Sequence, residues 1–248
     1  MLITRLVQKT QWGQLLSLVS PSFFEVLPTK SLRTEVGALM KSASDRAGFQ
    51  RRLEARKPLM QAFGWSQGHR GTHFEEVDGK IGSDLLAFYF AQLYSCDDLI
   101  PDLRSTTFKS EEGTVFWGPR TLYVDWSPDF IRNLRQLYTG FYEGDDAAYE
   151  GALSGLGLPG TGDLFRDHFG ANQDAVHFDL ARFQETFHRI FERCRTQRLR
   201  LHHHFVSFGI YLGTLYENLD RAGQPFDCAV AYRRGRDLAT TVGSDSPA

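Results

Sequence analysis

Apolar side chains recur every three or four positions through most of this chain, which is the spacing of an amphipathic helix. The two longest stripes cover residues 180–194 and 201–219. Such stripes have to be buried, so we expect these two helices to pack on each other or on a common core. Residues 81–95 are apolar on almost every side, which predicts a helix in the interior.

Shorter stripes and end signals predict further helices. Residues 3–19 have a fair helical face, and residues 31–63 predict one long or two shorter basic helices. Ser127 favours a helix start, because a serine side chain caps the first turn and the proline that follows fits its first position. Asp145 can cap the next helix in the same way. Residues 64–80 are rich in glycine and polar side chains, which predicts a loop.

One region has the composition of β-strands. The runs "TVFW" and "TLYVDW" flank a "GPR" turn, which predicts a β-hairpin over residues 114–125. We therefore expect a mainly α fold, a single helical domain with one short β-hairpin. Along the chain we expect a basic N-terminal helical segment at 1–70, a helical core at 71–240 and a disordered tail at 241–248.

Composition is that of a soluble globular protein, with 42% apolar and 23% charged residues. The longest apolar run, residues 85–94, is shorter than the roughly 18–20 residues of a transmembrane helix, so we expect no transmembrane segment. The sequence also lacks a secretory signal pattern, so we expect a cytoplasmic protein. Its three cysteines are far apart, which indicates neither a disulfide framework nor a cysteine zinc site.

Charge is unevenly distributed along the chain. Residues 1–70 contain 11 Lys/Arg against 4 Asp/Glu, whereas residues 71–180 contain 7 against 19. Arg51, Arg52, Arg56 and Lys57 could therefore meet a protein partner or an anionic membrane surface, which would make the protein peripheral to a membrane. The alternative is that this segment docks on the acidic middle of the same chain. Nucleic acid is not expected, because no basic stripe is interleaved with aromatic residues.

Three patterns contain metal-ligand residue types. Glu185 and His188 have the spacing of helical di-iron sites, but they lie off the apolar stripe, which is typical of a solvated face. His177 and Asp179 match the HxD pattern of facial-triad iron sites, which need a β-rich scaffold. Residues 202–204 are three histidines, which we interpret as a helix start. Consecutive helical residues point about 100° apart and do not readily share one ion.

Two aspartates stand where kinase-like enzymes keep acidic residues. Asp125 follows a short apolar run, and Asp102 precedes it by 23 positions. Kinase-like sites place a metal-binding aspartate after a short strand and a catalytic-loop aspartate about 20 residues earlier. The alternative for Asp125 is a turn residue that helps to cap the helix behind it. The sequence contains no GxSxG, HExxH or GxxxxGK[ST] motif. Its glycine run, residues 151–163, is expected to end a helix rather than follow a strand, which does not favour a phosphate-binding loop.

Around these aspartates the order of features resembles the AarF/UbiB family of atypical kinase-like proteins. "KIGSDLLAFYFAQLYSCDDLIPDLRSTTF" is similar to the helix and HADxHPGN loop of that family, and "GTVFWGPRTLYVDWSP" to its hairpin ending in DFG. "FIRNLRQLYTGFYEGDDAAYEGALSGLGL" resembles the helix that follows, and "RLRLHHHFVSFGIYLGTLYENLD" the late helix. Near the N-terminus, "QWGQLLSLVSP" resembles the K-x-G-Q-x-x-S segment. The resemblance implies a kinase-like C-lobe, with Asp102 catalytic, Asp125 metal-binding and Gln14 cofactor-binding.

The departures from the family pattern change the expected function. Gln11 replaces the K-x-G-Q lysine, Thr107 stands where the metal-binding asparagine would be, and residues 20–80 leave no room for a five-stranded N-lobe. Our leading hypothesis is a non-catalytic, pseudokinase-like binding or accessory protein acting on a protein or lipid partner. One alternative is a residual ATP-using enzyme of the AarF/UbiB type, with Mg-ATP as cofactor. The other is a helical metal-dependent oxygenase using Glu185 and His188.

Overall fold

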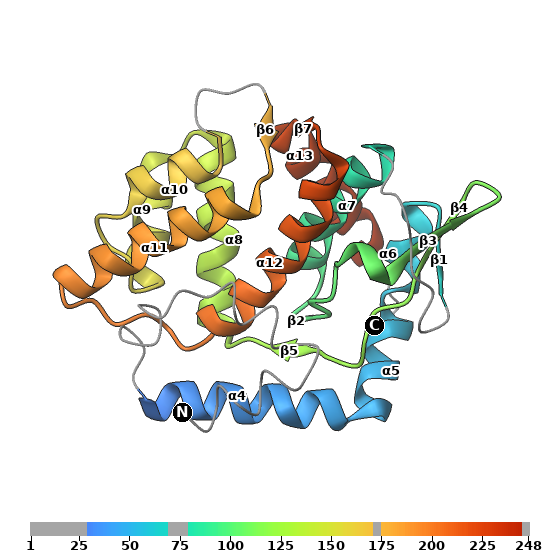
Figure 1. The fold of residues 1–248 in the computed structure, drawn as a ribbon, viewed down its shortest axis with the longest axis horizontal. Coiled ribbons are helices and arrows are strands. Elements are labelled where there is room, and N and C mark those ends of the chain that lie inside the picture. Colours follow the sequence, from blue (N-terminus) through green and yellow to red (C-terminus); the bar gives the residue numbers. More distant parts are fainter. Residues whose placement is uncertain (1–28, 69–78, 171–174, 245–248) are drawn as a thin grey trace.

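A computed structural model describes residues 29–68, 79–170 and 175–244, and the fold is mainly α-helical, as the sequence predicts (Figure 1). The helix predicted over 3–19 and the proposed cofactor-binding Gln14 lie outside these residues. The helices are α4 (Thr29–Ser44), α5 (Arg46–Ala55), α6 (Lys57–Ala62), α7 (Gly79–Ser95), α8 (Pro128–Glu143), α9 (Asp146–Gly155), α10 (Gly162–His168), α11 (Leu180–Thr196), α12 (Phe205–Ala222) and α13 (Cys228–Ser244).

Short strands form three small sheets in the described part of the chain. The first sheet has the order β1 (Trp65–Gln67), β4 (Thr114–Trp117), β3 (Phe108–Glu111), with β1 parallel to β4. The second pairs β2 (Asp98–Leu99) with β5 (Val124–Asp125), and the third pairs β6 (Val176–His177) with β7 (Pro225–Phe226), both antiparallel. Residues 65–67, which the sequence predicted as loop, are therefore a strand.

The predicted hairpin forms, but its position over 114–125 is wrong. The hairpin joins β3 to β4 through Glu112 and Gly113, and both of these residues have positive φ. Two residues with left-handed backbone conformation between antiparallel strands match the natural twist of a hairpin. The proline of the "GPR" turn cannot adopt that conformation, because its ring fixes φ at a negative value. The second expected strand instead runs apart from β4, and Val124 pairs with Leu99 of β2.

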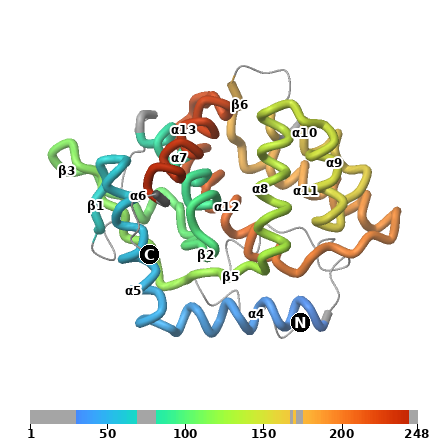
Figure 2. The backbone as a smooth tube through the Cα atoms, turned by 180° about the vertical axis from the view of Figure 1, so that it is seen from behind, coloured from blue at the N-terminus to red at the C-terminus, as the bar shows by residue number. Residues whose placement is uncertain are grey.

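The apolar stripes meet in a single core that includes the N-terminal helices. In both views α7 and α12 lie in the middle of the molecule, and α13 packs along α7 (Figures 1 and 2). Phe49, Leu53, Leu59 and Met60 of α5 and α6 are buried in the same cluster as the side chains of α7. The basic segment before residue 70 is thus part of the domain in its described portion, rather than an appendage.

Helix α4 runs across the outside of the molecule, beside β5 and the first turns of α12 (Figures 1 and 2). It ends at Ser44 because Asp45 starts a new helix, with its carboxylate accepting a hydrogen bond from the Gly48 amide. A further break at Arg56 makes residues 31–63 three helices instead of one or two. The direction of α4 relative to α5 is what brings α4 over the start of α12.

The sequence predicted the starts of two helices correctly but did not predict all of the helices. Ser127 caps α8 by accepting from the Phe130 amide, and Asp145 caps α9 by accepting from the Ala148 amide, as expected. Helices α10 and α13 were not predicted. The last turn of α13 occupies residues 241–244, so the first half of the expected disordered tail is helical. Among the described residues no helix is long and apolar enough to cross a membrane.

The α7–α13 contact gives a direct test of the fold. A Cβ added to Gly235 of α13 would lie 2.5 Å from the Ala87 carbonyl oxygen and 2.7 Å from the Phe90 Cβ of α7. We expect Gly235→Ala to lower the free energy of unfolding by about 1–3 kcal/mol, because the two helices must separate. The measurement is chemical denaturation followed by circular dichroism.

The matched control is Gly151→Ala in α9, where an added Cβ meets nothing within 4 Å. That change should raise the free energy of unfolding by up to about 1 kcal/mol, because alanine has a higher helix propensity than glycine. Equal effects of the two substitutions would contradict the close packing of α13 on α7.

Candidate functional site

Asp102, the proposed catalytic residue, is enclosed in the core. Its side chain is 0% exposed. The Arg104 guanidinium donates to both carboxylate oxygens, at 2.6 and 2.8 Å, and the Arg120 amide donates to Oδ2 at 3.0 Å. The Asp102 carbonyl accepts from Trp117 Nε1 at 3.0 Å. The residue therefore connects the 102–104 loop to β4 and to the chain behind it.

Asp125, the proposed metal ligand, lies in a different environment. Its side chain is 60% exposed, and Oδ1 accepts from the Arg52 guanidinium at 2.9 Å. In the β2–β5 pair it stands opposite Asp98. Two aspartates side by side repel each other, and Arg52 of α5 lies against both of them, with Nε 2.7 Å from an Asp98 oxygen. A side chain of this chain thus supplies the positive charge beside Asp125.

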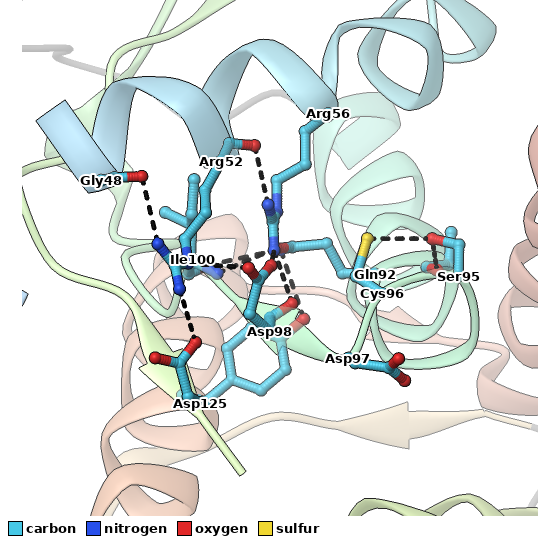
Figure 3. A network of polar contacts seen from close by, with 12 residues as sticks. Gly48, Arg52, Arg56, Gln92, Ser95, Cys96, Asp97, Asp98, Ile100 and Asp125 are labelled. Atoms are coloured by element: carbon cyan, nitrogen blue, oxygen red, sulfur yellow. Dashed lines mark hydrogen bonds and ion pairs between the residues drawn. The ribbon is translucent and has the colours of Figure 1, made fainter. Parts of the chain in front are cut away.

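Arg56 continues this network into the interior (Figure 3). Its side chain is 1% exposed. Its guanidinium donates to Gln92 Oε1 at 2.9 Å, to the Arg52 carbonyl at 2.7 Å, and to both the carbonyl and the carboxylate of Asp98. Gln92 accepts a second hydrogen bond, from the Ile100 amide. The N-terminal helices are thereby tied to α7 and β2.

This arrangement corrects the proposed partner surface at two of its four residues, Arg52 and Arg56. Arg56 is buried and Arg52 is half-buried, and both pair with acids of the 71–180 region, so neither presents an unpaired charge to a protein or membrane. Lys57 is exposed and pairs with Glu54, three residues earlier in the chain. Arg51 is exposed. The segment therefore docks on its own chain, which was the alternative reading of its charge.

A second polar cluster lies where α4 crosses the start of α12, and its central residue, Glu35, was not predicted from the sequence. Glu35 of α4 is 5% exposed. Its carboxylate accepts from Ser207 Oγ and lies 3.1 Å from His204 Nδ1, while Ser207 accepts from Trp126 Nε1 at 2.8 Å. The sequence did contain a sign that Glu35 is buried, because it lies three residues after the buried Leu32, on the same face of the helix.

The three histidines are not part of a helix. Helix α12 begins at Phe205, and residues 202–204 form the turn in front of it. Their rings are neighbours, with centroids 4.1–4.8 Å apart. Burial lowers the pKa of His202 to about 4, helped by the charges of His203 and His204, and burial also lowers the pKa of His203. The neutral imidazole is therefore the form these two residues keep near pH 7.

A cavity of about 260 Å³ adjoins both polar clusters. It is lined by Thr34, Glu35, Ala38, Leu39, Lys41, Ser42, Tyr123, Val124, Asp125, His203 and His204. Asp125 is thus on the wall of a cavity, as a site residue should be, but Asp102 is not among the residues that line it. The two aspartates that the sequence grouped together lie in separate environments, one in the core and the other beside α4.

The other histidine patterns lie elsewhere. Glu185 and His188 are exposed on α11, and His188 contributes to the wall of a separate surface cavity. His177 is exposed in β6, and Asp179 caps α11. Within the described ranges, residues 202–204 are the one group of three or more His, Cys, Asp or Glu side chains close enough to hold a metal ion. In the part of the chain that the structure describes, Glu185 and His188 thus have no third ligand beside them for the oxygenase hypothesis.

No protein-family model matches this chain, and no relative is found among curated proteins. The resemblance to the AarF/UbiB family stays a prediction from the sequence.

The buried arginine gives the first test of this region. We expect Arg56→Gln to lower the free energy of unfolding by about 3–5 kcal/mol, because glutamine cannot replace the charge facing Asp98 or reach all four acceptors. Arg51→Gln, five residues earlier and exposed, should change it by less than about 0.5 kcal/mol. Denaturant unfolding of both variants measures the difference. Similar values for the two would mean that Arg56 does not dock α5 on the core.

Proposed function

We propose that this chain is a non-catalytic, pseudokinase-like helical binding protein that acts on a protein partner. The observation that carries the proposal is the ion pair between Arg52 and Asp125. In the kinase-like reading, Asp125 holds the metal that neutralises the phosphates of ATP. Here an arginine of the same chain already faces that carboxylate, and a second aspartate, Asp98, is neutralised by the same network.

The environment of Asp102 supports the same proposal. A catalytic-loop aspartate has to reach the hydroxyl group of a substrate. The carboxylate of Asp102 is instead enclosed, with a bidentate arginine contact that fixes its orientation. For phosphoryl transfer, Asp102 would have to release Arg104 to reach a substrate hydroxyl. Asp125 would have to release Arg52 to bind a metal ion. Residual ATP use, the alternative, thus needs two rearrangements rather than one.

A protein partner is favoured over a lipid surface because most of the basic side chains at 51–57 are already paired with acids of the same chain. Attraction to an anionic membrane depends on several lysines or arginines facing it together. Of the four basic residues at 51–57, two pair with Asp98 and Lys57 pairs with Glu54. The cavity beside α4 combines acidic, hydroxyl, imidazole and apolar groups with a single lysine, Lys41, which suits a mixed protein surface better than a lipid headgroup.

Nucleotide titration tests the proposal. Because Arg52 competes for Asp125 and the sequence lacks a phosphate-binding loop, we expect Mg-ATP to bind no tighter than millimolar. Asp125→Asn should leave that weak affinity unchanged, and Asp129→Asn, an exposed acid on α8, is the matched control. Isothermal calorimetry gives the dissociation constants. A value near 10 μM that is lost in Asp125→Asn alone would favour the enzyme alternative.

A further inference from the structure

The three-histidine turn has the composition of a metal site. The ligand atoms that His202, His203 and His204 can offer all lie within 4.8 Å of one another. We had expected them to diverge by a helical step of about 100° each, but they precede α12, so this restriction does not apply. Their backbone instead turns so that the three rings are neighbours, with His202 stacked on His203 and His204 tilted against both.

The buried acid behind the turn orients one of the rings. His204 Nδ1 lies 3.1 Å from Glu35 Oε2, and Glu35 also accepts a hydrogen bond from Ser207. His204 Nε2 accepts from the Ser127 amide at 3.0 Å, so the proton of the neutral ring is on Nδ1, facing Glu35. A carboxylate that holds the Nδ1 proton of an imidazole is the usual support of a metal-binding histidine, because it fixes the ring and strengthens the other nitrogen as a ligand.

Among the described residues, the other two rings make fewer polar contacts than that of His204. The Nδ1 of His202 accepts from the His204 amide at 3.3 Å, and its ring packs against Phe130. His202 and His203 are half-buried, and among the described residues the ring of His203 takes part in no hydrogen bond. His203 and His204 also line the cavity between α4 and β5. Ring nitrogens that can accept a bond, beside a cavity, are what an entering cation needs.

We propose that His202, His203 and His204 together bind one divalent transition-metal ion, with Glu35 as a positioning residue. Three imidazole nitrogens favour zinc, cobalt, nickel or copper over magnesium and calcium, which prefer oxygen ligands. Bonds of about 2.0–2.1 Å require the rings to move closer together, which the half-buried His202 and His203 can do by rotation. The ion replaces the Ser127 amide at His204 Nε2, since the bond to the charged Glu35 is the stronger of the two.

A site with three protein ligands leaves a position for a further ligand. This position opens toward the cavity, since two of the three histidines line it. The inference uses neither Asp102 nor Asp125 and does not depend on the kinase-like resemblance. Failure of one proposal would therefore leave the other standing.

Metal titration of the whole chain, without an affinity tag and after treatment with a chelator, tests the proposal. Zinc chloride followed by calorimetry should bind at one equivalent per chain, and magnesium chloride should give no saturable binding. His202→Gln and His203→Gln should each weaken zinc binding by at least tenfold. The matched controls are His177→Gln and His188→Gln, two exposed histidines outside the turn, which should bind zinc like the parent.

Cobalt provides a second readout that depends on coordination instead of stability. The visible absorption of bound Co²⁺ should appear in the parent protein and be lost in His203→Gln, with circular dichroism confirming that the variant is folded. Glu35→Gln should weaken binding by about 10–100-fold and shift the cobalt spectrum, while the stoichiometry stays at one. The absence of saturable zinc binding, or binding that is equal in the parent, His202→Gln and His203→Gln, would overturn the proposal.

Discussion

A single buried charge, the guanidinium of Arg56, determines how the described N-terminal helices are attached to the rest of the molecule. Removing an arginine side chain from water costs several kcal/mol unless its donors find acceptors. Here the acceptors come from Arg52 in α5, Gln92 in α7 and Asp98 in β2. The same set of bonds cannot form if α5 shifts by one turn, so the polar network fixes the register of a contact that apolar packing alone would leave adjustable.

The position of α4, and with it the candidate site, follows from this attachment. Helix α4 reaches the start of α12 because Asp45 turns the chain between α4 and α5, and α5 is held by Arg56. Tyr123 adds a tie, since its hydroxyl donates to Asp45 and Arg52 lies over its ring. Only with α4 in this place does Glu35 meet His204, and only then does α4 close one side of the cavity beside β5.

The sequence predicted what depends on local chemistry. The mainly α fold and the caps at Ser127 and Asp145 rest on neighbouring residues and were confirmed. The hairpin was misplaced because Glu112 takes a left-handed conformation that its side chain does not suggest. Pairings between distant residues were beyond local patterns. Nothing near Arg56 in the sequence shows that two of its acceptor residues, Gln92 and Asp98, lie 36 and 42 positions away. Glu35 meets His204 across 169 positions.

The attachment of α5 to the core depends on the coupling between Arg56 and Asp98, and a double-mutant cycle measures this coupling most directly. The free energies of unfolding of the parent, Arg56→Gln, Asp98→Asn and the double variant give the interaction energy of the pair. We predict a favourable coupling of about 1–3 kcal/mol, because the two side chains are in direct contact and Arg56 is buried. Additive effects, with a coupling indistinguishable from zero, would contradict the claim that this ion pair docks the N-terminal helices.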